Sequence, residues 1–157
     1  MNTAVHLSNI VERLRTSFPW TTFYFDRRTG EIIPITFDDF HQAERPFLIE
    51  YESDGKPDAK QIARAVLNGD ERYVEMPSPS DYDEHSIMER FCFSIEDDRI
   101  SQLLSESLRG REGVAQFEQA INRLGVIEEW YGYLVLELRW IAKQWCENND
   151  IDFIEDV

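Results

Sequence analysis

The sequence has few of the residues on which disulfide frameworks, metal sites and membrane spans depend. Its 157 residues include two cysteines, Cys92 and Cys146, and three histidines that lie far apart. Both cysteines stand among apolar residues, which favours two buried thiols over a disulfide. No apolar run approaches the ~20 residues that cross a bilayer, and the first residues lack the pattern of a signal peptide. We therefore predict a cytoplasmic protein that does not bind membranes.

Motifs of catalytic and cofactor sites are also missing. There is no Gly-x-Ser-x-Gly elbow, and the Gly-rich segment at 110–113 is too short for a phosphate-binding loop. The segment from Asp81 begins like a calcium loop, with Asp83 and His85 at its third and fifth positions. However, Ser86 stands where that loop needs glycine, and Cys92 where it needs glutamate. We predict no catalytic residue, no cofactor and no metal site.

Acidic side chains outnumber basic ones, and this excess is uneven along the chain. The formal net charge is −15. Residues 1–70 carry 11 acidic and 8 basic side chains, whereas residues 71–157 carry 20 acidic and 8 basic ones. This balance opposes direct binding to nucleic acid or to an anionic membrane, because like charges repel. It favours a basic partner, or simply a well-solvated surface without one.

The pattern of residues 1–77 predicts a small antiparallel sheet with one or two helices. Apolar residues at helical spacing predict a first helix that stops before Pro19. Two β-rich runs flank Asp26–Gly30, which predicts a hairpin in which Gly30 has a positive φ. Further elements are expected as a helical turn over Phe37–Phe40, a strand over Phe47–Glu52, a helix from Pro57 to Gly69 and a strand over Arg72–Pro77.

The pattern of residues 78–157 predicts a mostly helical half. Ser80 is the expected N-cap of its first helix. Gly110 is expected to end the second helix in a left-handed conformation. The second helix is predicted over Asp97–Leu108, the third over Arg111–Leu124 and the fourth and longest over Ile127–Trp145. The fold class is therefore α+β, a single domain over 1–157 with two lobes, 1–77 and 78–157.

Five segments resemble a family of bacterial proteins without an assigned function. They are YFDRRTGEII at 24–33, GDERYVEMP at 69–77, SIMERFCFSIEDD at 86–98, LSESLRGREGVAQFEQAI at 104–121, and EEWYGY at 128–133 with LRWIAKQWCENNDIDF at 138–153. Their order is similar to that in uncharacterised protein family 0158, which has an Arg-Tyr strand, a Gly-Arg-Gly-Ala-Phe-like corner and a Trp-containing final helix. The sequence departs from that corner at Glu112, Gly113 and Val114. The resemblance implies the order of elements and no chemistry.

The most conspicuous polar feature is the corner Arg109-Gly110-Arg111. Two arginines beside a helix N-terminus could hold a carboxylate or phosphate, with Arg72 joining them. The structural interpretation is that Arg109 complements the dipole of the preceding helix and Arg111 pairs with nearby acids. Trp140 is the tryptophan expected at a groove or interface, because Trp130, Trp140 and Trp145 cannot all face one core.

These observations support three hypotheses about function. The first is a non-enzymatic interaction or regulatory module whose acidic helical half binds a basic protein partner. The second is an enzyme or small-anion-binding protein that uses a cluster of Arg72, Arg109 and Arg111. The third is a mimic of nucleic-acid charge that occupies a DNA- or RNA-binding protein. A pocket lined by the arginines would favour the second hypothesis, and an acidic face with exposed aromatic side chains the first or third.

Overall fold

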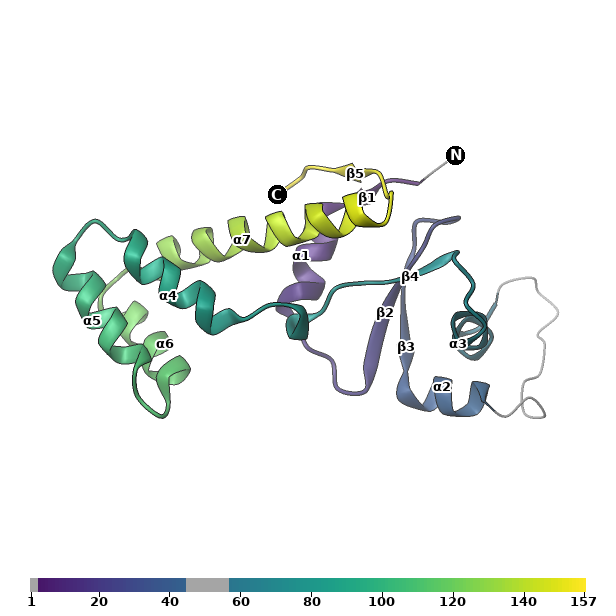
Figure 1. Ribbon diagram of the computed structural model, residues 1–157, viewed down its shortest axis with the longest axis horizontal. Helices are drawn as coiled ribbons and strands as arrows, with labels where there is room; N and C mark the ends of the chain where they lie inside the picture. Colours follow the sequence, from purple (N-terminus) through teal and green to yellow (C-terminus); the bar gives the residue numbers. More distant parts are fainter. Residues whose placement is uncertain (1–2, 45–56) are drawn as a thin grey trace. The chain divides into compact units, whose positions relative to one another are not determined.

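The computed structural model describes residues 3–44 and 57–157 and divides into two compact units (Figure 1). Unit 1 consists of Met1–Pro79 and Ile141–Val157, and unit 2 consists of Ser80–Trp140. The fold is α+β, as predicted, with small sheets in unit 1 and helices in unit 2. The division after Pro79 lies two residues from the predicted lobe boundary, but residues 141–157 belong with the first unit. The strand predicted over Phe47–Glu52 lies outside the described residues.

A three-stranded antiparallel sheet forms the centre of unit 1. Its strands are β2 (Thr21–Asp26), β3 (Ile32–Thr36) and β4 (Tyr73–Glu75), in the order β3-β2-β4. The predicted hairpin is confirmed as β2 and β3, paired from Thr21↔Thr36 to Phe25↔Ile32. Gly30 has a φ of +77° in the connecting turn, a conformation that side chains with a Cβ rarely adopt. The strand predicted near Arg72 is confirmed as β4.

Two helices in unit 1 begin with reciprocal capping boxes. In α2 (Phe37–Ala43) the cap joins Thr36 and Asp39, and in α3 (Ala59–Leu67) it joins Asp58 and Gln61. Each pair satisfies two backbone N–H groups that a helix start leaves unbonded. The helices pack with the sheet around a core of six buried side chains, Tyr24, Ile35, Ala43, Ile62, Ala63 and Tyr73.

The first and last described segments of the chain are joined in unit 1. Strand β1 (Val5–His6) pairs in parallel with β5 (Phe153–Ile154). The helix α1 (Leu7–Arg15) has no cap from its own N-cap residue. Instead, Asp156 accepts a hydrogen bond of 2.8 Å from the backbone N–H of Ser8 and another from its hydroxyl. The C-terminal tail therefore caps the first helix.

Unit 2 contains three helices and most of a fourth. They are α4 (Glu84–Ser94), α5 (Asp98–Leu108), α6 (Gly113–Arg123) and α7 (Ile127–Asn148), whose last turns lie in unit 1. Three buried aromatic side chains lie together in the core, with ring centroids 5.1–6.2 Å apart: Phe91, Phe117 and Trp130. The half-buried Tyr133 ring lies 5.5 Å from Phe91. Among the described residues, no helix is long and apolar enough to cross a membrane. Both cysteines are free and buried, as predicted.

The predicted N-cap at Ser80 is wrong. A short 3₁₀ turn, η2 (Pro79–Asp81), occupies that position, and α4 begins only after Asp83. The Asp83 carboxylate accepts hydrogen bonds from the backbone N–H groups of His85 and Ser86. A carboxylate at this place also interacts favourably with the positive end of the helix. The acidic run therefore has a capping role, at a site three residues later than predicted.

The prediction that Gly110 ends its helix in a left-handed conformation is also wrong. Arg109 is the C-cap residue of α5, with helical φ and ψ, and Gly110 has no positive φ. The glycine that the corner requires is Gly113. A Cβ there would lie 2.3 Å from the backbone oxygen of Leu108, whereas a Cβ at Gly110 would have no neighbour within 4 Å. The close approach of α6 to the end of α5 therefore depends on Gly113.

Candidate functional site

Arg72 is one of four residues that the sequence predicts as site residues, and it forms a buried ion pair. Its Nε and Nη2 donate hydrogen bonds of 2.8 Å each to the two carboxylate oxygens of Asp26. Asp26 is only 2% exposed and also accepts from the backbone N–H of Arg28 and the Thr29 hydroxyl. Two parallel bonds of this kind are among the strongest that a carboxylate makes. The pair ties the hairpin turn to the start of β4.

The protonation of Asp26 reflects these contacts. Burial on its own would raise the pKa of this carboxyl group. The hydrogen bonds from Arg72, Arg28 and Thr29, together with the charge of Arg72, outweigh burial and lower the pKa to about 2. Asp26 is therefore ionised at neutral pH, and the Arg72 guanidinium is already occupied by a carboxylate of its own chain. Arg72 lies in unit 1 and the other two arginines in unit 2, so neither unit holds the predicted three-arginine cluster.

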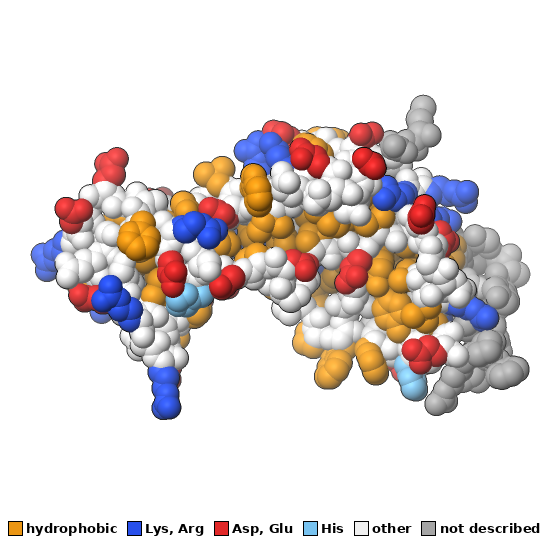
Figure 2. Space-filling view, in the orientation of Figure 1, with side chains coloured by type: hydrophobic (Ala, Val, Ile, Leu, Met, Phe, Trp, Pro, Cys, Tyr) orange, Lys and Arg blue, Asp and Glu red, His pale blue; other side chains and the backbone are white. Residues whose placement is uncertain are grey.

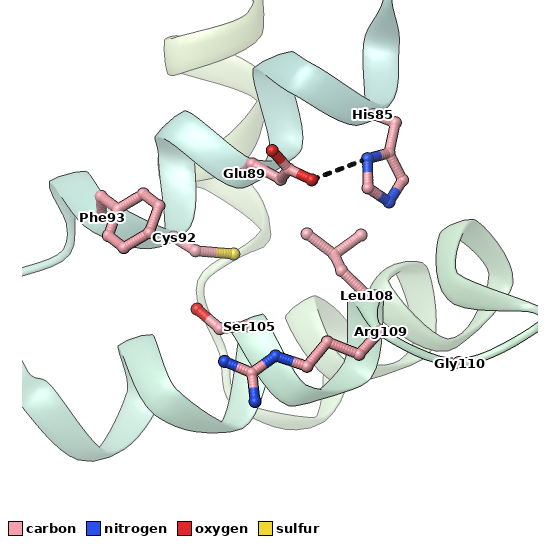
Figure 3. A pocket seen from close by; sticks show the side chains of 8 residues that line it. All are labelled: His85, Glu89, Cys92, Phe93, Ser105, Leu108, Arg109 and Gly110. Carbon is pink, nitrogen blue, oxygen red and sulfur yellow. Dashed lines mark ion pairs between the residues drawn. The ribbon is translucent and has the colours of Figure 1, made fainter.

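Arg109 lines a pocket in unit 2, named here the α4–α5 pocket (Figure 3). Its volume is about 510 Å³, within the usual range of small-molecule sites. Helix α4 supplies four of the lining residues and α5 with the following turn supplies the other four: His85, Glu89, Cys92, Phe93, Ser105, Leu108, Arg109 and Gly110. Arg111 is exposed and is not among them. The corner thus contributes its first arginine to a cavity and leaves the second outside.

The polar groups of the α4–α5 pocket lie on facing walls. On α4, Nδ1 of His85 lies 3.1 Å from a carboxylate oxygen of Glu89, four residues along the helix. On α5, the Arg109 side chain runs along the pocket toward Ser105 (Figure 3). Within the part of the chain that the structure describes, no protein group pairs with the Arg109 guanidinium. The pocket therefore offers a negative group on one wall and an unpaired cation on the other.

The floor of the pocket is uncharged. Cys92 is 1% exposed, and burial is the main cause that raises the pKa of its thiol, against a hydrogen bond with Ser105 that lowers it. A thiol in that state is a poor nucleophile, because the thiolate is the reactive form. His85 and Cys92 are also two turns apart on α4, with Glu89 between them. The arrangement suits binding, and it lacks an activated nucleophile.

Trp140 lies at a second concave surface of unit 2, named here the Trp140 groove. This groove has a volume of about 540 Å³ and is lined by Arg90, Tyr133, Leu136, Glu137 and Trp140. Trp140 and Leu136 are each 62% exposed, whereas Trp130 on the same helix is buried. The Arg90 guanidinium donates a 3.0 Å hydrogen bond to Glu137, which joins α4 to α7. Trp140 thus lines a concave surface of unit 2 and is largely exposed.

Sequence reasoning missed most of the residues around Trp140. The four α7 residues of the groove are spaced i, i+3, i+4 and i+7, so they form a stripe on one face of the helix. Its residues other than Glu137 are apolar or aromatic, so this second stripe is visible in the sequence beside the buried one. Arg90 and Phe93 carry no such signal, since their neighbours in space come from other helices.

Metal ligands do not gather in the described part of the chain. Within residues 3–44 and 57–157, no group of three or more His, Cys, Asp or Glu side chains is placed to hold an ion. Asp83 instead caps α4, and His85 faces Glu89. The acidic segment at 81–85 is explained by helix capping.

Comparison with known proteins gives one match. The model of an uncharacterised protein family, UPF0158, covers residues 3–156, nearly the whole chain. No curated protein matches the chain. No solved structure matches it either. The match extends the resemblance carried by the five segments to both units, and the chain belongs to the uncharacterised protein family UPF0158.

Proposed function

We propose that this protein is a non-enzymatic, cytoplasmic interaction module of bacteria. In this proposal the Trp140 groove of unit 2 binds a basic segment of a partner protein. The observation that carries it is the exposure of Trp140 and Leu136, each 62%, beside a groove, in a unit whose core already has three buried aromatic side chains. Large apolar side chains exposed together around a concavity are typical of binding surfaces.

The composition of the groove supports a protein ligand. Tryptophan, tyrosine and arginine are the residues most often found at the energetic centres of protein interfaces. The groove has one of each, Trp140, Tyr133 and Arg90. Its stripe along α7 has the spacing with which helices contact one another. Figure 2 shows hydrophobic side chains at the surface of unit 2, with acidic and basic groups beside them. An amphipathic segment would match such a surface.

The charge of unit 2 supports a basic partner. Residues 80–140 carry 13 acidic and 6 basic side chains. At the groove itself, the Arg90 charge is balanced by Glu137, so it does not repel a cationic segment. Complementary charge speeds association and selects among partners more than it adds affinity. The two buried free thiols fit a reducing compartment such as the cytoplasm.

The test is affinity capture from a lysate of the native cell with three immobilised forms of the protein. The forms are the parent, Trp140→Ala, and Phe93→Ser as a matched control that removes another exposed aromatic side chain of unit 2. We expect a basic protein to be retained by the parent and the control and lost by Trp140→Ala. Retention should weaken steeply with salt, because the attraction is partly electrostatic.

Other outcomes would overturn the proposal. Equal capture by all three forms would show that the groove is not the binding surface. Capture of a DNA- or RNA-binding protein that is released by added duplex DNA, irrespective of Trp140, would favour the charge-mimic hypothesis. Failure of the parent to retain any protein above a matrix without immobilised protein would contradict the interaction module itself.

A further inference from the structure

We infer that the α4–α5 pocket is a binding site for a small zwitterion of the amino-acid type with an apolar side chain. In this assignment Arg109 holds the carboxylate, Glu89 holds the ammonium group, and Phe93 with Leu108 contacts the side chain. The inference is independent of the Trp140 groove, since the two surfaces share no lining residue. It also revises the three-arginine hypothesis, because only Arg109 of that set lines a pocket.

The Arg109 guanidinium is the first part of the argument. Acidic side chains outnumber basic ones by 31 to 16 in this protein, so an arginine on a helix has many opportunities to pair. Among the described residues, Arg72 and Arg90 are paired with acids, whereas the Arg109 guanidinium pairs with none and lines a cavity. Guanidinium groups bind carboxylates through two parallel hydrogen bonds. The pocket therefore has a ready partner for a ligand carboxylate.

Glu89 is the second part, and it decides between a simple anion and a zwitterion. Its carboxylate lies on the α4 wall, where its ion pair is with Nδ1 of His85 (Figure 3). A ligand carrying only negative charge would approach Arg109 against repulsion from Glu89. A ligand with an ammonium group as well satisfies both walls, since Glu89 has acceptor capacity beyond its contact with His85.

Phe93 is the third part. Its side chain is 84% exposed although it lines the pocket, and Leu108 is buried at the pocket's inner surface. An aromatic ring left in water beside a concavity gains stability when a ligand covers it, at about 25 cal/mol for each Å² removed from water. The uncharged floor formed by Cys92 and Ser105 adds no competing ion. These features select a ligand with an apolar group beside its two charges.

The experiment is calorimetric titration of the whole protein with three related probes. L-Phenylalanine has both charges, 3-phenylpropionate lacks the ammonium group, and 2-phenylethylamine lacks the carboxylate. We expect L-phenylalanine to bind, and each singly charged probe to bind at least about tenfold more weakly, since each leaves one wall unpaired. Equal binding of 3-phenylpropionate and L-phenylalanine would overturn the zwitterion assignment. Failure of L-phenylalanine to bind at millimolar concentration would overturn it as well.

Matched variants locate the binding. Arg109→Gln should abolish L-phenylalanine binding, and Glu89→Gln should weaken it at least about tenfold. Arg111→Gln removes the same charge two residues away, outside the pocket, and should leave binding unchanged. Circular dichroism checks that each variant is folded. Equal losses in Arg109→Gln and Arg111→Gln would show a general effect of charge and contradict the site, whereas Trp140→Ala should have no effect on this titration.

Discussion

Arg72 in unit 1 and Arg109 in unit 2 are the same residue type near a turn, yet the structure uses them differently. Arg72 makes two 2.8 Å hydrogen bonds to Asp26, a carboxylate with almost no exposure to water. Arg109 is exposed, and among the described residues no acid forms an ion pair with it, although Glu89 lines the same α4–α5 pocket. The difference lies in the acid: a buried carboxylate must be paired, so it fixes its arginine in a structural role. An arginine without such a partner remains available to a ligand.

Removal of the buried Asp26 carboxylate should change the free energy of unfolding more than any other substitution considered in this comparison. Asp26→Ala leaves the half-buried Arg72 guanidinium unpaired and removes the acceptor for the Arg28 N–H and the Thr29 hydroxyl. We expect a loss of about 3 kcal/mol in the free energy of unfolding, measured with urea. Asp152→Ala, at an exposed position of the same unit, is the control and should change little. Equal losses would show that Asp26 is not the anchor of the turn.

Acid should weaken unit 1 through the same carboxylate. The pKa of Asp26 is about 2 in the folded protein, below the ordinary value of 3.8. Its contribution is therefore present above pH 4 and is lost as the pH falls through 2, for a total of about 2 kcal/mol. The difference in unfolding free energy between the parent and Asp26→Asn should shrink by that amount between pH 5 and pH 2. A constant difference would mean that the ion pair does not depend on the charge of Asp26.

At the α5–α6 corner, substitution of Gly113 should lower the free energy of unfolding more than substitution of Gly110, although the sequence had indicated Gly110 as the glycine with a special conformation. Gly113→Ala would force a Cβ against the backbone of Leu108, so we expect a loss of about 2 kcal/mol. Gly110→Ala meets nothing within 4 Å and has no left-handed strain, so its effect should stay within about 0.5 kcal/mol. Thermal and urea unfolding of both variants measures this. A larger loss at Gly110 than at Gly113 would show that the corner closes differently.

The smallest effect is expected at Arg109. If its guanidinium only lines a pocket, Arg109→Gln should change the free energy of unfolding by less than about 0.5 kcal/mol. Arg72→Gln, which leaves Asp26 buried without its charged partner, should cost several times more. Urea unfolding of the two variants side by side completes the comparison. Similar losses would mean that Arg109 has a structural partner as important as Asp26.

Local signals in the sequence predicted most of the described elements. The hairpin followed from a glycine between two β-rich runs, and each predicted helix followed from one apolar stripe, as in α1 and α6. The ends of helices were harder to predict where two nearby residues could each serve as the N-cap. Ser80 and Asp83 are both good N-caps, and Asp83 has this role because a 3₁₀ turn occupies Pro79–Asp81.

The candidate sites depend on contacts that no local pattern reveals. Trp140 was predicted at a groove because the three tryptophans of one helix cannot all point into the same core. The pairing of Asp26 with Arg72 joins residues 46 positions apart, and the α4–α5 pocket joins two helices through side chains of ordinary type. Gly113 shows the same limit, because its need for a small side chain comes from the backbone of Leu108. From the sequence alone, Gly110 is the glycine that one would expect the corner to require, because it directly follows the last predicted turn of the helix.

The cap that Asp156 places on the first helix has a consequence for the order of folding. Unit 2 is a continuous stretch, whereas unit 1 needs residues 141–157 to complete both the β1–β5 pair and the start of α1. On the ribosome, residues 80–140 are therefore all present before unit 1 has its last strand. Contacts between residues about 150 positions apart close slowly, because a long chain segment must be ordered first. In a nascent chain, residues 80–140 can therefore form their helices while unit 1 still lacks residues 141–157.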